Sequence, residues 1–261
     1  MTGAPLSTEY SPGIRVIQAL PGARALIEQT VGGPWIVKGE TSSLPDKGHD
    51  ALAMGTRTVA VVDGATPLEA SWPQDLDEFA RLVARCIVQR ADRAFGSAFE
   101  VWDSVLAQVR EAFPDSGVSR TAAAAFAVFE ADVVHMSVLG DVDIRYLVGD
   151  EWRELHDDRL ALAEQRLVLP PGTSLKAARI ALRRTANSHD GYPILGTDLV
   201  DAYAPLSVTV GAEDLRTVVL LSDGAREVES GGRDVDDATR VEISRREIMS
   251  RRRRDLAGVG S

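Results

Sequence analysis

The chain has 261 residues, a net charge of -10 and 44% hydrophobic residues, an ordinary composition for a soluble globular protein. Its 39 acidic against 29 basic residues argue against nucleic acid as a partner, because a phosphate backbone needs a basic surface. One cysteine, Cys86, excludes an intramolecular disulfide and is typical of a reducing cytosol. We find no secretory signal and no apolar run long enough to span a bilayer, so we expect a cytoplasmic protein with no membrane partner.

The N-terminal part of the chain predicts little regular structure before the first buried strand. Residues 1–34 are rich in proline, glycine and small side chains, and predict an extension or an edge strand around residues 14–17. We expect the remainder, residues 35–261, to form a single domain. The β-branched run at residues 58–62 predicts a buried strand, which ends at Asp63 and Gly64.

Two amphipathic helices and a block of strands are predicted next. Apolar residues recur at helical spacing over 76–87 and again over 99–109. Residues 122–129 and 133–139 predict one hairpin, and residues 144–148 and 152–155 predict another. Paired helices beside antiparallel hairpins indicate a layered α+β domain.

The C-terminal third combines a break, a strand and a charged segment. Residues 157–185 are mixed in character and are interrupted by Pro170-Pro171-Gly172. A second buried strand is predicted at residues 217–221, ending at Ser222, Asp223 and Gly224. The charged segment 241–256 is expected to be helical.

Three predicted strands end in the same way, with an aspartate next to a glycine: Asp63, Asp141 and Asp223. A buried strand is rigid and therefore holds a carboxylate at its end accurately, and glycine lets the backbone turn sharply there. Any one of these patterns is most often only a turn. Three in one chain favour a shared site, where converging carboxylates would repel one another unless a cation were bound. Oxygen ligands favour Mg²⁺ or Mn²⁺.

The ordered set of motifs resembles the PPM/PP2C family of metal-dependent protein phosphatases, in a bacterial branch. The segment 62–67 resembles the family's first Asp-Gly motif, and Ser222-Asp223-Gly224 resembles its Ser-Asp-Gly motif. The hairpin over 121–141 resembles the central hairpin that ends in Gly-Asp. The resemblance implies a four-layer α-β-β-α sandwich of two antiparallel sheets flanked by helices. It also implies that Asp63 bridges two ions, that Gly64 and Asp223 are further ligands, and that Asp141 serves an additional ion.

The resemblance is incomplete at the edge of the implied site. Asp50 stands where members carry the acid of a Glu-Asp or Gln-Asp pair, with His49 as a departure. Pro45 stands where members carry a phosphate-holding arginine, so the phosphate ligand is unknown, with Lys47 or Arg57 as candidate substitutes. Asp236 matches the family's last metal ligand. The alternative is an accidental match, in which 241–256 is a helical segment and that ligand is missing.

The activity implied is that of a PPM-type serine/threonine phosphatase, a phosphoric monoester hydrolase. Two Mg²⁺ or Mn²⁺ ions, or three, would activate a bridging water for attack on phosphorus, with Asp63 catalytic through that water. The family's usual substrates are phosphoserine and phosphothreonine in proteins. The alternatives are a catalytically weak PP2C-like regulator and a small-molecule phosphatase acting on a phosphorylated metabolite.

Overall fold

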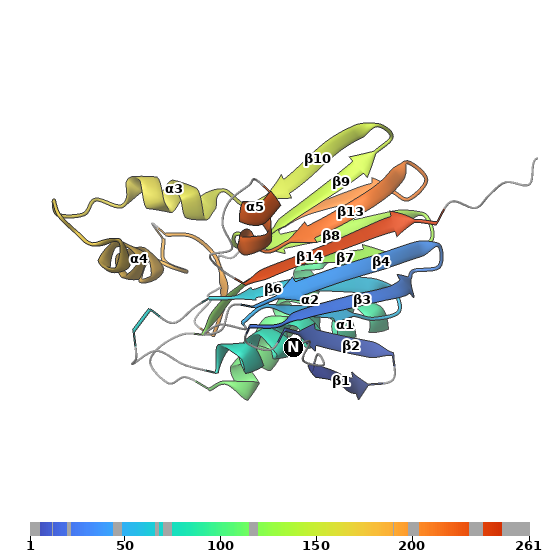
Figure 1. The fold of residues 1–261 in the computed structure, drawn as a ribbon, viewed down its shortest axis with the longest axis horizontal. Coiled ribbons are helices and arrows are strands. Elements are labelled where there is room, and N and C mark those ends of the chain that lie inside the picture. The colour runs from blue at the N-terminus through green and yellow to red at the C-terminus, as the bar shows by residue number, and fades with distance from the viewer. Residues whose placement is uncertain are drawn as a thin grey trace, which may run out of the picture.

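The computed structural model describes residues 6–11, 13–19, 22–43, 49–65, 68–69, 75–114, 120–189, 191–197, 204–229 and 237–246. Two antiparallel sheets lie face to face, and helices flank them (Figure 1). The class is therefore the α+β sandwich that the sequence predicts. No helix in these ranges is long and apolar enough to cross a membrane.

The first sheet has eight strands in the order β1-β2-β5-β6-β7-β8-β12, and β11 pairs with the start of β7. The bounds are β1 Leu6–Ser11, β2 Ile14–Gln18, β5 Ala51–Met54, β6 Thr58–Gly64, β7 Thr121–Phe129, β8 Val133–Leu139, β11 Leu195–Gly196 and β12 Leu206–Gly211. Both faces of this sheet are covered. Alternate residues of β6 therefore belong to two different cores, which explains its unbroken apolar sequence.

The second sheet has six strands in the order β10-β9-β13-β14-β4-β3. The bounds are β3 Arg24–Val31, β4 Trp35–Ser42, β9 Asp143–Val148, β10 Glu151–His156, β13 Leu215–Leu221 and β14 Ala238–Arg245. Its inner face packs on the first sheet around Trp35, Ile144 and Leu220. This contact between two twisted sheets forms the central core of the domain.

Helices α1 (Leu76–Arg93) and α2 (Ala98–Ala112) cover the outer face of the first sheet. Their apolar faces, which include Phe79, Ile87 and Trp102, are fully buried against that sheet. The indole Nε1 of Trp102 donates a hydrogen bond to Ser137 Oγ on β8 at 2.9 Å, so the buried ring has its polar atom satisfied.

The outer face of the second sheet is covered only in part among the described residues. Helix α5 (Asp223–Glu229) packs on β13 and β14. Beyond it, opposite charges face each other across the strands: Glu154 across from Arg145, and Lys38 across from Glu242. Such a ladder of charges suits contact with water.

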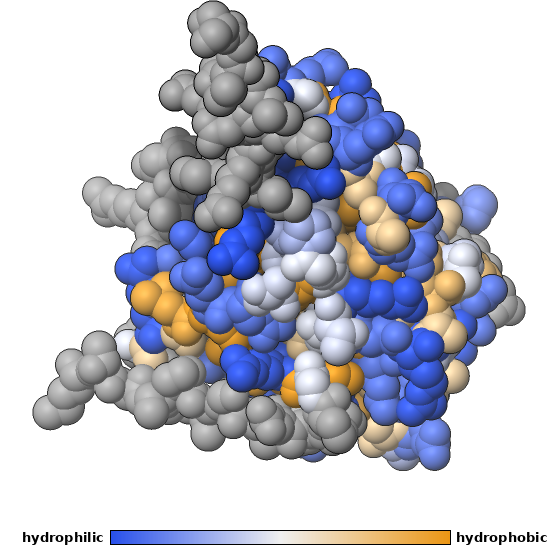
Figure 2. All heavy atoms as spheres, turned by 90° about the vertical axis from the view of Figure 1, so that its right-hand side faces the viewer, coloured by the Kyte–Doolittle hydropathy of each residue, from blue (hydrophilic) through white to orange (hydrophobic). Residues whose placement is uncertain are grey.

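Helices α3 (Arg159–Arg166) and α4 (Leu175–Arg183) extend beyond one end of the sandwich, on the left of Figure 1. They pack on Tyr192 and Ile194 in a small cluster of their own. Figure 2 views the molecule from the opposite end, where hydrophilic residues predominate over small scattered hydrophobic patches.

The prediction of a helix near the C-terminal end is wrong. Residues 241–245 form the second half of β14 rather than a helix, because alternate residues point into the sandwich core between β13 and β4. The N-terminal region, expected to be an extension or an edge strand, forms strands in both sheets, with β1 and β3 at the sheet edges. It supplies β1 and β2 to one sheet and β3 to the other, so the predicted boundary at residue 35 falls inside the β3–β4 hairpin.

Candidate metal centre

The aspartates singled out in the sequence lie at one end of the sandwich, where several strands begin or end. Asp63 is near the end of β6, and Asp50 directly precedes β5, whose Ala51 pairs with Val62. Asp141 follows β8, and Asp223 begins α5 directly after β13. Because neighbouring strands run antiparallel, the start of one strand lies beside the end of the next, and these segments meet at the same end of the sandwich.

The carboxyl groups interact with one another. Asp63 and Asp223 are in hydrogen-bonding contact. Burial, followed by the negative charges of Asp50, Asp223 and Asp141, raises the pKa of Asp63 well above its ordinary value. Burial and the charge of Asp223 likewise raise the pKa of Asp141 to about 6. Groups that repel one another in this way have converged in space.

Asp50 is the most deeply buried of these residues, at 3% exposure. Its burial and the charge of Asp237 raise its pKa to about 8, against hydrogen bonds from Ser222 and Thr239 that lower it. Its Oδ2 atom is buried and has no hydrogen-bond partner among the residues that the structure describes. A buried carboxylate oxygen without a donor is a site that a cation would satisfy.

Asp237, which the sequence analysis did not select, belongs to this cluster. It is 3% exposed, and its carboxylate accepts a hydrogen bond from the backbone N–H of His49 at 2.8 Å. The candidate Asp236 lies outside the described residues. The adjacent aspartates at 236 and 237 signalled a ligand before the last strand, but only the structure shows that Asp237 is buried and bonded to the segment that carries Asp50.

Two glycines allow the acidic segments to approach so closely. A Cβ atom on Gly64 would lie 2.6 Å from the carbonyl oxygen of His49, the residue before Asp50. Gly140 has a φ of 88°, and a Cβ there would lie 2.8 Å from Ala123 Cβ. Both contacts are too short for a side chain.

The donor set fits a hard divalent ion, since it consists of carboxylate oxygens supplied by rigid strand ends. Within the described ranges, however, no three acidic, histidine or cysteine side chains already stand at metal-binding distances. Mutual repulsion among the carboxylates is expected to hold them apart, so binding would require them to close on the ion.

The candidates for holding phosphate are not confirmed. Arg57 precedes β6, about 20 Å from Asp63 along an extended strand, so it lies at the opposite end of that strand. Its guanidinium instead pairs with Glu130 and donates to the carbonyl of Ala91. Lys47 lies outside the described residues. The arginines whose charges act on Asp141 are Arg183 at the end of α4 and Arg226 on α5.

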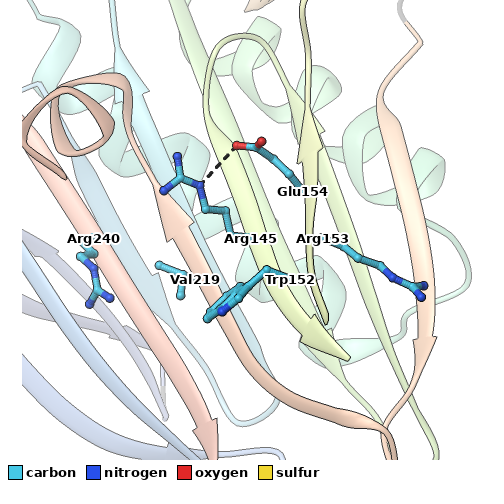
Figure 3. A pocket seen from close by; sticks show the side chains of 6 residues that line it. All are labelled: Arg145, Trp152, Arg153, Glu154, Val219 and Arg240. Carbon is cyan, nitrogen blue, oxygen red and sulfur yellow. Dashed lines mark hydrogen bonds and ion pairs between the residues drawn. The ribbon is translucent and has the colours of Figure 1, made fainter. Parts of the chain in front are cut away.

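A separate hollow of about 460 Å³ lies on the outer face of the second sheet (Figure 3). It is lined by Arg145, Trp152, Arg153, Glu154, Val219 and Arg240. None of the converging aspartates lines it. The guanidinium of Arg145 pairs with Glu154 at 3.3 Å, and that of Arg240 pairs with Glu242 at 2.9 Å. The hollow is therefore part of the solvated charge ladder and not of the acidic site.

Comparison with known proteins identifies the fold. The sequence matches no protein-family model and no curated protein. Among solved structures, a serine/threonine phosphatase from Staphylococcus aureus is similar with a TM-score of 0.51 and 11% identity, over 87% of this chain and 96% of that one. The Mycobacterium tuberculosis serine/threonine phosphatase PstP has a TM-score of 0.49 and 16% identity, over 89% of this chain and 98% of that one.

The chain thus has the fold of the PPM/PP2C-type bacterial serine/threonine phosphatases. The resemblance read from the sequence motifs is confirmed at the level of the fold. At such low identity the similarity shows the fold alone, and activity must be argued from the site.

Proposed function

We propose that the protein is a metal-dependent phosphatase that hydrolyses phosphomonoesters, with phosphoserine and phosphothreonine in proteins as its substrate class. The observation that carries the proposal is a convergence of buried carboxyl groups at one end of the sandwich: Asp50, Asp63, Asp141, Asp223 and Asp237. Burying mutually repelling carboxylates costs free energy, and groups perturbed in this way cluster at functional sites. One of them, Asp50, has a buried oxygen without a hydrogen-bond partner in the described part of the chain.

The residues present would hold Mg²⁺ or Mn²⁺, two ions or three. We assign Asp63 as the shared ligand, since it interacts with Asp50, Asp223 and Asp141 alike. The backbone of Gly64 can approach an ion because no side chain stands there. When bound, such ions supply an activated water and neutralise charge on the phosphoryl oxygens. Asp50 and Asp237 are the most buried of the proposed ligands. Asp141 is the ligand on which the charge of Arg183, at the end of α4, acts.

The alternative is a catalytically weak regulator with the same fold, favoured by Pro45 in place of the family's phosphate-holding arginine. A small-molecule phosphatase would share the same centre, and substrate comparison separates the two. Neither alternative changes the prediction of a metal site.

The experiment is hydrolysis of p-nitrophenyl phosphate and of phosphoserine and phosphothreonine peptides by the full chain with Mn²⁺ or Mg²⁺. We expect activity that EDTA and Asp63→Asn abolish, and that the matched Asp150→Asn leaves intact, because Asp150 is 92% exposed at a distant turn. A folded wild type that binds Mn²⁺ but hydrolyses none of these esters would establish the regulator instead. Turnover of the aryl phosphate without the peptides would favour metabolite substrates.

A further inference from the structure

Another buried acid lies beside the metal centre and is not part of the ligand set. Asp143, at the start of β9, is 1% exposed. Its Oδ1 accepts a hydrogen bond from His156 Nδ1 at 2.5 Å, and its Oδ2 accepts one from Arg226 Nη1 at 3.2 Å. A buried carboxylate bonded on both oxygens is a firm anchor for the groups that it holds.

Arg226 is placed next to two of the proposed ligands. It lies three residues after Asp223 on α5, so the two side chains share a face of that helix. Its anchor, Asp143, lies two residues after Asp141. The guanidinium therefore lies between the segments that carry Asp223 and Asp141.

The contact with Asp143 leaves most N–H donors of the Arg226 guanidinium available. A guanidinium has five N–H donors, and the contact with Asp143 occupies one of them. Within the described residues the Arg226 side chain makes no other hydrogen bond, and it is 35% exposed. Free donors in a fixed plane at the edge of an acidic, cation-binding site suit an incoming phosphoryl group, which guanidinium binds through two parallel hydrogen bonds.

We propose that Arg226, positioned by Asp143 and His156, binds the phosphoryl group of the substrate. It would do so in place of the arginine that the family carries where this chain has Pro45. The inference rests on the proposed function for its substrate. Asp143 and His156 are positioning residues, since they act through Arg226.

A second arginine must be weighed against this assignment. Arg183, at the end of α4, also acts on Asp141, and its side chain is hydrogen-bonded to the phenol of Tyr192. Tyr192 belongs to the small cluster under α3 and α4, outside the sandwich core. Arg226 is bonded instead to Asp143, a sheet residue beside the metal centre, and this favours Arg226 as the fixed phosphate ligand.

The test measures binding rather than turnover, so that it remains valid if the protein hydrolyses nothing. Inorganic phosphate is titrated by calorimetry into the Mn²⁺-loaded full chain and into five variants. They are Arg226→Met, Arg226→Lys, Asp143→Asn, Arg183→Met and the control Arg216→Met, in which the replaced arginine pairs with exposed Asp150 at the far end of β13. Mn²⁺ affinity and thermal stability are measured for each.

We expect Arg226→Met to weaken phosphate binding about 10- to 100-fold, the loss typical of charge-assisted hydrogen bonds. Mn²⁺ affinity should be unchanged or higher, because a nearby positive charge is removed. Arg226→Lys should recover part of the binding, and Arg216→Met should match the wild type. Asp143→Asn should weaken phosphate binding less than Arg226→Met does, since the guanidinium loses its anchor but remains present.

Three results would overturn the assignment. If Arg226→Met lowers the melting temperature but binds phosphate like the wild type, Arg226 only ties α5 to the sheet. If Arg183→Met alone weakens binding, the phosphate ligand is Arg183. If the loaded wild type binds no phosphate, the site is not one for phosphoryl groups. Phosphate binding that depends on Arg226 without hydrolysis of any ester would refute the proposed function and leave this inference standing.

Discussion

Replacing Asp50 by asparagine removes one buried ionisable group from the metal centre, and so measures how much its ionisation destabilises the folded state. Burial, and then the charge of Asp237, raises the pKa of Asp50 from 3.8 to about 8. In the metal-free protein, the folded state therefore keeps this proton up to about pH 8, whereas the unfolded chain releases it near pH 4. Between these values the folded state binds more protons, so the free energy of unfolding falls as the pH rises.

The size of the effect follows from the shift. Between pH 5 and pH 8 the folded state loses up to about 4 kcal/mol relative to the unfolded chain, at 1.36 kcal/mol for each pH unit. Local hydration reduces such burial penalties. We therefore expect the stability difference between Asp50→Asn and wild type to shift in favour of the variant by about 2–4 kcal/mol from pH 5 to pH 8.5. For a chain of this size that is roughly 4–16 °C in melting temperature.

The assay is urea unfolding in EDTA, followed by tryptophan fluorescence, at pH 5 and pH 8.5. Wild type should lose stability over this range, and Asp50→Asn should lose less, although Asp63 and Asp141 continue to titrate. Mn²⁺ should stabilise wild type most at pH 8.5, because binding favours the ionised ligands, and should stabilise the variant little. Equal pH dependence in the two proteins would refute the argument that Asp50 is held protonated by burial and by Asp237.

Two further substitutions test the packing that builds the site and the fold. Gly64→Ala places a Cβ 2.6 Å from the backbone oxygen of His49, which must move, so Mn²⁺ affinity measured by calorimetry should fall by roughly tenfold or more. Wild-type affinity in that variant would show that the close approach does not matter. Ser137→Ala leaves the buried indole N–H of Trp102 without its acceptor, and urea unfolding should show a loss of about 1–3 kcal/mol. A negligible loss, with the melting temperature unchanged, would mean that a water replaces the hydroxyl.

The positions of the central acids could be predicted because they depend on local sequence. An apolar run that stops at an aspartate and a glycine defines both the strand and its end, and this identified Asp63, Asp141 and Asp223 without knowledge of their neighbours. The fold class followed from the same runs, since two hairpins beside paired amphipathic helices leave few layered arrangements.

The remainder of the site was decided by pairing between distant segments. Residues 241–245 belong to a charged segment that the sequence predicts to be helical, yet they form a strand because β13 and β4 pair with them on both sides. That pairing also decides that Asp237 faces Asp50, which is far away in the sequence. The contact of Arg226 with Asp143 likewise requires α5 to be docked on the second sheet.

The sequence by itself thus determined which acids end the buried strands, because apolar runs and turn residues act over a few neighbours. Only the tertiary structure decided which other groups meet them, because register and sheet packing bring together residues whose separation along the chain carries no signal. Asp237 is buried just before β14 begins, and Arg57 lies at the end of β6 opposite Asp63.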